Sequence, residues 1–399
     1  MMIHSLLSGD TPRSRVLSVL LLVILLCLAC GPFLFDDVRA FSTLGTICVF
    51  IVVVASYDLM LGYTHIVSFA HTMFFGIGAY SVAIATGALG STFSAVLVGA
   101  LCAILISTAL SLLLGLLSLR VKALFFALVT LAVAFAFLSL VTQLYHLTGG
   151  EDGLRVRVPS ELGPAFRPFD GQLYGFDVPG FIAALFSDPA HALQEAVFKV
   201  RFSGRHLMYY ISFVCSLCAF LFLLRVVNSP FGRVLQAIRE NEFRAQALGY
   251  RTVFYRTAAV ILSAVMASLA GVLFALINRY VNPENTLNFE LMVFILLMCV
   301  IGGMGTLYGA VVGASLFILA QNYLQDLLRF IGHQMPEHTL FAELVQPDRW
   351  LLWFGLLFVL SVYFFPTGVV GQLRIWAARR ASRSGNRRTG NQQEEHHAS

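Results

Sequence analysis

Residues 228–256 read NSPFGRVLQAIRENEFRAQALGYRTVFYR, a charged segment between two long apolar runs. The segment carries signals for the start and the end of a helix. Asn228 or Ser229 can cap a helix, and Pro230 suits its first turn. Gly249 suits the left-handed residue that follows a last turn. The segment is therefore predicted to fold as an ordered helical unit outside the apolar part of the chain.

Apolar residues recur along this unit at roughly helical spacing: Phe231, Val234, Leu235, Ile238, Ala245 and Leu248. The pattern predicts one amphipathic helix, or two short helices with a bend near Asn241. Glu240 and Arg244 stand four residues apart, which predicts an ion pair worth roughly 0.3 kcal/mol. Two interpretations of the apolar stripe remain open. It packs on its own protein or on the lipid surface, or it docks a soluble partner.

The composition places the whole chain in a membrane. Its 399 residues are 58% hydrophobic and 12% charged, whereas a soluble domain has a charged fraction of roughly 25%. We expect an all-α polytopic membrane protein with 8–10 transmembrane helices, some broken or re-entrant. The seven cysteines all lie in apolar runs, and their two CxxC spacings lack a second pair or a histidine partner. We therefore interpret them as packing residues and expect no metal site.

Ten apolar runs divide the chain. They cover residues 16–35, 41–61, 62–90, 93–119, 123–145, 207–227, 255–277, 289–301, 307–323 and 350–365, approximately. We expect residues 1–15 to form an N-terminal segment, residues 16–373 the transmembrane domain, and residues 374–399 a disordered tail. Residues 146–205 are predicted to be a compact loop with short elements. Asp58, near the end of the second run, is expected to reach the membrane interface.

Two runs are unusually rich in glycine and polar residues. The first, residues 62–90, contains His65, Ser68, His71, Gly76, Gly78 and Tyr80. The second is interrupted by Gly302, Gly303 and Gly305, which leave two short pieces. Such residues let helices approach closely, or let a helix break where it lines a cavity. Both interpretations, a packing face and the lining of a translocation path, remain open.

Arginine and lysine placement predicts the orientation. Residues 13–15, 120–122, the central segment and the tail are rich in basic residues and fall on one side of a ten-span topology. The short loops on the other side have few. Basic loops stay in the cytoplasm, so we expect both termini and residues 228–256 to be cytoplasmic and residues 146–205 to be extracytoplasmic.

Several function classes are disfavoured. The spans hold almost no charged residues of the kind that relay protons in ion-coupled carriers. The chain has no GxxxxGK[ST] motif for ATP hydrolysis, no HExxH and no nucleophile elbow, so we expect no catalytic residues and no enzyme activity. The chain is therefore predicted to be a channel, a facilitator, or one subunit of a larger transporter, and the ordered segment 228–256 favours the subunit.

At this segment the chain resembles a known family. SPFGRVLQAIRENEFRAQALGY is similar to the cytoplasmic coupling loop of ABC importer permeases of the branched-chain amino acid, LivM/LivH, type. Four further stretches agree in order: HTMFFGIGAY, TGGEDGL, LSAVMASLAGVLFAL and LMCVIGGMGTLYGAVVGA. The long loop 146–205 fits the LivM-type better than the LivH-type.

The resemblance implies a set of partners. These are a LivH-like second permease, two LivF- and LivG-like ATPases that use ATP, and a periplasmic substrate-binding protein, in the bacterial inner membrane with its lipid. This chain would bind no cofactor and no nucleic acid. The residues implied to couple to the ATPases are Arg233, Ile238, Arg239, Glu240, Glu242, Arg244, Ala245, Leu248 and Gly249.

One departure concerns the substrate. The family commonly has Gly-Gln and Gly where this chain has His65-Ile66 and Ala70. Branched-chain amino acids are the expected substrate. The alternatives are urea, amides or other small acids, and a channel or facilitator that works alone.

Overall fold

The computed structural model describes residues 15–35, 38–117, 123–163, 165–166, 172–176, 197–201, 203–333, 346, 349–364, 368–373 and 376. The expected N-terminal segment and tail lie almost entirely outside these residues, as does much of the loop 146–205. The helices are α2 (Arg15–Leu34), α3 (Val38–Thr64), α4 (His71–Leu89), α5 (Phe93–Leu117), α6 (Ala123–Gln143), α7 (Tyr145–Thr148), η1 (Ser160–Leu162), α10 (Gly204–Val227), α11 (Pro230–Glu240), α12 (Glu242–Ala247), α13 (Thr252–Asn278), α14 (Pro283–Thr286), α15 (Phe289–Gly302), α16 (Leu307–His333) and α18 (Trp350–Phe364).

The described residues include nine helices that are long and apolar enough to cross a membrane. This confirms the predicted all-α polytopic membrane protein. The tenth predicted run forms α18, whose 15 residues rise only about 22 Å at 1.5 Å per residue, less than a bilayer core of about 30 Å.

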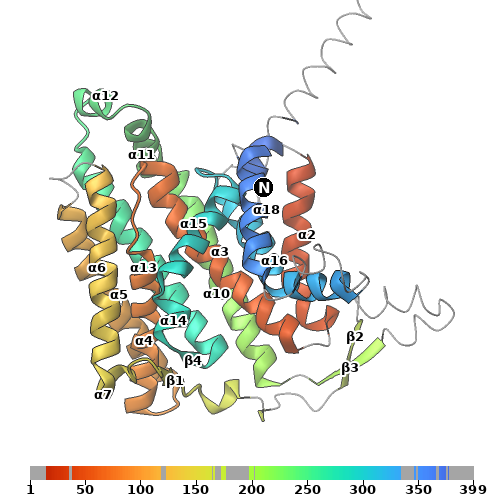
Figure 1. Ribbon diagram of the computed structural model, residues 1–399. Helices are drawn as coiled ribbons and strands as arrows, with labels where there is room; N and C mark the ends of the chain where they lie inside the picture. The colour runs from red at the N-terminus through yellow and green to blue at the C-terminus, as the bar shows by residue number, and fades with distance from the viewer. Residues whose placement is uncertain are drawn as a thin grey trace, which may run out of the picture.

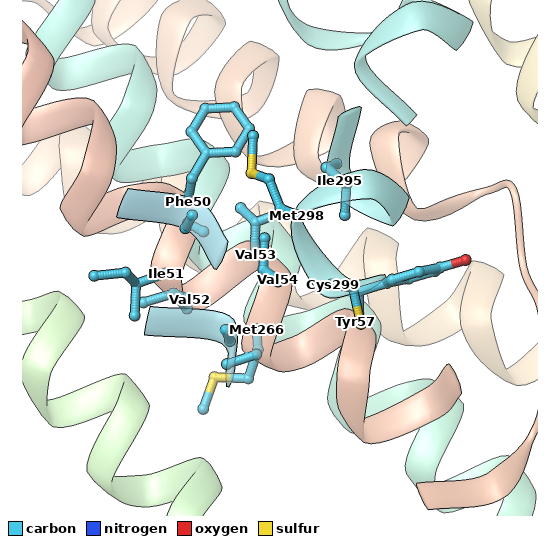
Figure 2. Packing of buried hydrophobic residues seen from close by; sticks show 14 of the residues in the cluster. Phe50, Ile51, Val52, Val53, Val54, Tyr57, Met266, Ile295, Met298 and Cys299 are labelled. Atoms are coloured by element: carbon cyan, nitrogen blue, oxygen red, sulfur yellow. The ribbon is translucent and has the colours of Figure 1, made fainter. Parts of the chain in front are cut away.

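The core of the bundle is built around α3 (Figure 1). In its membrane-spanning stretch 89% of the residues are buried, against 22% in α2, α5 and α6. Figure 2 shows how residues of α3 such as Phe50, Val53 and Tyr57 lie among side chains of α13 and α15. The apolar side chains of the peripheral helices point outward, as expected where lipid is the solvent.

Helices α4 and α13 approach each other closely because each presents a glycine. A Cβ atom on Gly78 would collide with the backbone carbonyl of Ser268, and one on Gly271 with that of Phe75. Small residues at such contacts let two backbones pack directly in a membrane. The HTMFFGIGAY and LSAVMASLAGVLFAL stretches therefore meet along one helix pair.

This contact predicts a contrast between two glycines of α4. Gly78→Ala should lower the stability of the bundle by about 1–3 kcal/mol, because overpacking displaces the α13 backbone. Gly87→Ala should leave it unchanged or slightly higher, because a Cβ there meets nothing within 4 Å and alanine favours a helix. Thermal unfolding in detergent measures both, and equal midpoints would contradict the predicted close contact.

The structure refines two expectations about the apolar runs. The run 62–90 is interrupted at residues 65–70, and its remainder, His71–Leu89, forms one continuous helix that is long and apolar enough to cross a membrane. The run predicted to end at residue 323 continues in α16 to His333, where a polar loop was expected. Asp326 on this added part accepts a hydrogen bond from Arg39 of α3 at 2.7 Å, and this pairing of polar groups supports the extension.

The strands described in and near the loop 146–205 are short, which confirms the prediction of short elements for the described part of it. β1 (Leu154–Arg155) pairs antiparallel with β4 (Tyr280–Val281), and β2 (Gln172–Phe176) pairs with β3 (Val197–Arg201). The first pair lies at the end of the bundle opposite α11 and α12 (Figure 1). It ties the TGGEDGL stretch to the end of α13.

Candidate functional site

The segment 228–256 folds as two helices with the predicted signals in place. The side chain of Ser229 accepts the backbone N–H of Gly232 at 3.5 Å, and Pro230 is the first residue of α11. The bend falls at Asn241, as predicted. Asn241 ends α11, and its side chain accepts the backbone N–H of Arg244 at 3.0 Å to cap α12.

The bend explains why one predicted ion pair is wrong. Glu240 and Arg244 are not on consecutive turns of a single helix, because Asn241 has an extended backbone between them. The carboxylate that pairs in this segment is that of Glu242, which accepts a hydrogen bond from Arg256 of α13 at 2.9 Å.

Gly249 ends the unit with a turn that requires its left-handed backbone. Its φ is 86°, and its N–H donates to the carbonyl of Gln246 at 2.9 Å. The N–H of Tyr250 donates to the carbonyl of Ala245 at 3.2 Å. These two bonds form a Schellman motif, which confirms the predicted helix end.

Most of the apolar stripe packs on the protein itself. Leu235, Ile238 and Ala245 are buried, and Phe231 stacks on Tyr255 with ring centroids 5.7 Å apart. For these residues the interpretation as a partner-docking face is wrong. The stripe seats α11 on the membrane domain, where it contacts α3 and α13.

A second set of apolar side chains is exposed instead. We call Phe243, Leu248, Tyr250 and Phe254 the exposed patch; Phe243 is 85% and Leu248 70% exposed. Helix α12 stands clear of the bundle (Figure 1). Apart from Leu248, the residues of the exposed patch were not predicted from the sequence. The signal was present, because Phe243 is two residues from the buried Ala245, about 200° around the helix.

Arg239 connects α11 to the loop between α3 and α4. Its Nε donates to Nε2 of His65 at 2.8 Å, and its Nη1 donates to the carbonyl of Gly62. A Cβ on Gly305 would also lie against this guanidinium. The predicted coupling loop and two glycine-rich runs thus meet at one place.

Asp58 lies beside this meeting point and is buried, not at the interface as expected. Its Oδ1 accepts the backbone N–H of Gly305 at 2.7 Å and the thiol of Cys299 at 3.5 Å. A Cβ on Gly62 would collide with both this carboxylate and the Gly305 nitrogen. We call Asp58, Gly62, His65, Arg239 and Gly305 the junction cluster. The sequence did not indicate Asp58 and Gly62 as site residues, because the two donors to the carboxylate, the thiol of Cys299 and the N–H of Gly305, come from a distant part of the chain.

The three glycines of the second glycine-rich run form the turn between α15 and α16. Gly303 has a φ of 113° and Gly305 a φ of 78°. A Cβ on Gly302 would collide with the carbonyl of Gly309. These positions need glycine because the two helices reverse direction here with their backbones in contact.

The other predicted path residues lie in helix contacts. The Nε2 atom of His71 is 3.0 Å from Oγ of Ser56, and Gly76 lies against Leu287. Tyr80 and Ser68 are buried. A role for these residues in a translocation path stays a prediction.

His65 has an unusual backbone and a charged neighbour. Its φ is 56°, a conformation that glycine adopts most readily. Burial lowers the pKa of its imidazole below the ordinary value, and the positive charges of Arg239 and Arg256 lower it further. The ring must be neutral at Nε2 to accept the Arg239 N–H, so the lowered pKa favours this contact.

The contact should therefore weaken in acid. Because the pKa of His65 is lower in the folded state, its contribution to stability is complete above the ordinary value of 6.5 and is lost as the pH falls through the folded pKa. We expect the unfolding midpoint to fall more between pH 7.5 and pH 5 in the natural protein than in His65→Gln, which keeps an acceptor that does not titrate. Equal falls would show that His65 does not titrate against Arg239.

The nine long apolar helices of the described residues are those of a multi-pass membrane protein. The chain belongs to the family described as branched-chain amino acid transport system / permease component, whose model matches residues 39–362.

Curated relatives match in part. The high-affinity branched-chain amino acid transport system permease protein LivM of Salmonella typhimurium is 29% identical over 119 residues, 30% of this chain and 28% of the relative. A probable branched-chain amino acid transport permease protein LivM of Methanocaldococcus jannaschii is 29% identical over 156 residues, 38% and 42% of the two chains. The autoinducer 2 import system permease protein LsrC of Yersinia pseudotuberculosis is 35% identical over 100 residues, 24% and 27%.

The chain thus spans between 27% and 42% of the lengths of these relatives. No solved structure matches it.

Proposed function

We propose that this chain is the transmembrane permease subunit of an ATP-driven importer, and that the exposed patch docks a cytoplasmic ATPase. The proposal depends on one observation: residues 228–256 have a buried apolar face and a separate set of exposed apolar side chains. One face of the segment packs on the membrane domain, whereas the exposed patch stays uncovered: Phe243 of α12, Leu248 and Tyr250 in the connection that follows, and Phe254 in the first turn of α13. Exposed apolar side chains that gather on a charged segment outside the long apolar runs favour an interaction surface for a partner.

The proposed orientation follows from the arginines. Arg225, Arg233, Arg239, Arg244, Arg251 and Arg256 all lie in or beside this segment, and basic loops remain on the cytoplasmic side of a membrane. The opposite end, with α14 and the β1–β4 pair, then faces outward toward a substrate-binding protein. We propose that both chain termini lie in the cytoplasm, beneath a bacterial inner membrane, which requires α18 to complete a tenth crossing.

The proposed mechanism passes through the junction cluster. An ATPase that moves α12 moves α11 with it, because the two helices share Asn241. Arg239 transmits the motion to the Gly62 carbonyl and His65. The turn at Gly305, held by Asp58, passes the motion to α15 and α16. ATP hydrolysis by the partner would thereby alter a path within the membrane domain, with no cofactor bound by this chain.

The complete transporter would contain a LivH-like second permease, two LivF- and LivG-like ATPases and a periplasmic binding protein. We propose a branched-chain amino acid as substrate, since two relatives carry that description in their names. A third relative is named for autoinducer 2 import, so similarity to these relatives does not single out one substrate. Urea, amides or other small acids therefore stay as alternative substrates.

Co-expression with the neighbouring genes tests the function. We expect ATPases to co-purify with this chain, and proteoliposomes of the complex, supplied with binding protein and ATP, to accumulate L-leucine. A chain that purifies alone and passes solute without ATP would instead be a facilitator.

A further inference from the structure

A cavity of about 450 Å³ lies among α3, α13, α14, α15 and α16, at the end of the bundle opposite the junction cluster. Its volume is within the range of roughly 300–1,000 Å³ that is common for small-molecule sites. None of the residues predicted from the sequence to line a path is among its walls. Its lining divides into a charged mouth, a polar wall and an apolar floor.

The mouth carries two carboxylates whose charges are not neutralised within the described part of the chain. Glu284 lies on α14 and Glu290 in the first turn of α15, and both line the cavity. Across the described residues, neither forms an ion pair. The basic residue of the lining, Arg39, is engaged elsewhere, with Asp326 at 2.7 Å and the carbonyl of Asn322. The mouth is therefore suited to a positive group.

The wall offers neutral hydrogen-bonding groups from several helices: Thr43, Thr46, Asn278, Asn285, Asn288 and Gln321. Some are fixed by their own contacts. Asn285 and Asn282 cap the two sides of one turn through reciprocal bonds of 2.9 and 3.1 Å. Amides and hydroxyls both donate and accept, so they can orient a polar solute without adding charge.

The floor is apolar. It is formed by Phe50, Phe274, Phe294, Met298 and Ile318. Figure 2 shows two of these residues, Phe50 of α3 and Met298 of α15, with their side chains directed toward each other. The rings of Phe50 and Phe274 meet edge to face with centroids 6.3 Å apart. A flexible methionine among phenylalanines adapts to side chains of different shapes.

We propose that this cavity is a binding site for a solute that combines a primary ammonium group with an apolar side chain. Glu284 and Glu290 receive the ammonium, the amides orient the polar part, and the floor receives the apolar side chain. The inference rests on the proposed function and deepens it, because it assigns substrate recognition to residues that the sequence pattern did not indicate. It also favours a solute with a primary ammonium group over urea or a neutral amide as the cargo.

Helix α15 links this site to the junction cluster. Its first turn carries Glu290 at the mouth, and Met298 lies at the floor. One residue further, Cys299 donates to Asp58, and the Gly305 turn follows. A displacement of the turn through Arg239 therefore acts on the helix that holds both ends of the site.

The test compares two photoreactive probes that differ in the ammonium group. Photo-leucine (2-amino-4,4-azipentanoate) and 4,4-azipentanoate share a diazirine and a carboxylate, and only the first carries the ammonium. The complete complex, without binding protein, is irradiated in nanodiscs with each probe. We expect photo-leucine to label α3 and α15 peptides near Phe50 and Met298 about ten-fold more than 4,4-azipentanoate, and Glu284→Gln/Glu290→Gln to remove this preference.

The controls separate this inference from the proposed function. Glu161→Gln removes an exposed carboxylate that lies outside the cavity and should label like the natural protein. Equal labelling by the two probes in the natural protein, which requires no variant to fold, would overturn the site. A preference that survives in the double variant would overturn the role of the two carboxylates. ATP-dependent leucine uptake is measured in parallel. If uptake occurs without preferential labelling, the site is refuted and the proposed importer function is not. If uptake is absent and no ATPase co-purifies, the proposed importer function is refuted.

Discussion

Replacing Phe243 and Leu248 together by aspartate is expected to abolish co-purification of the ATPases. Both side chains are among the most exposed apolar groups of the described chain. Truncating central apolar contacts of an interface costs roughly 2–4 kcal/mol each, and a buried carboxylate adds a desolvation cost. We expect the affinity for the ATPase to fall by at least a thousand-fold. The yield of ATPase per permease in a pull-down measures the effect.

Tyr174→Asp is the matched control for this variant. Tyr174 is also an exposed aromatic residue, but it lies on β2, which the proposed orientation places outside the cytoplasm. This variant should retain the ATPases in full. If the double variant also retained them, the exposed patch would not be the docking surface.

Arg239→Gln is expected to separate ATPase binding from transport. Glutamine cannot reach both the His65 ring and the Gly62 carbonyl with a charged donor, so the connection between α11 and the α3–α4 loop is lost. The exposed patch is untouched. We expect the ATPases to co-purify at the natural yield, while substrate uptake per ATP hydrolysed falls about ten-fold or more in proteoliposomes.

Arg251→Gln serves as the control here, since it removes an exposed arginine at the start of α13 without touching the junction cluster. Its uptake per ATP should match the natural protein. A loss of ATPase from Arg239→Gln itself would contradict the assignment, because it would place this arginine at the partner interface rather than within the permease.

Local signals in the sequence predicted the coupling segment well. Ser229, Asn241 and Gly249 each act through bonds to residues within five positions, so their effects are readable from spacing alone. The class of protein could also be predicted from the sequence, because the length and apolarity of a membrane span are properties of one continuous run of residues. These predictions depended on nothing distant in the chain.

Apart from the Glu240–Arg244 pair, which fails because of the local bend at Asn241, the wrong predictions about the site involve residues brought together by the fold. Asp58 stands near the end of an apolar run, and its carboxylate is held in the interior by the Cys299 thiol and the Gly305 N–H, which lie 241 and 247 positions later in the chain. The cavity draws its walls from five helices, and no stretch of sequence contains enough of them to form a motif. The apolar stripe was detected correctly, but which of its neighbours would stay exposed depended on how α11 seats against α3.

The bend at Asn241 also has a consequence for how such a transporter can evolve. It assigns contact with the membrane domain to α11 and most of the free surface to α12 and the turn that follows it. Substitutions at Phe243 or Leu248 can then alter which ATPase is accepted, while Leu235, Ile238 and Arg239 keep the connection to the permease unchanged. A duplicated copy of this chain could acquire a different ATPase through a few changes on one short helix and its turn.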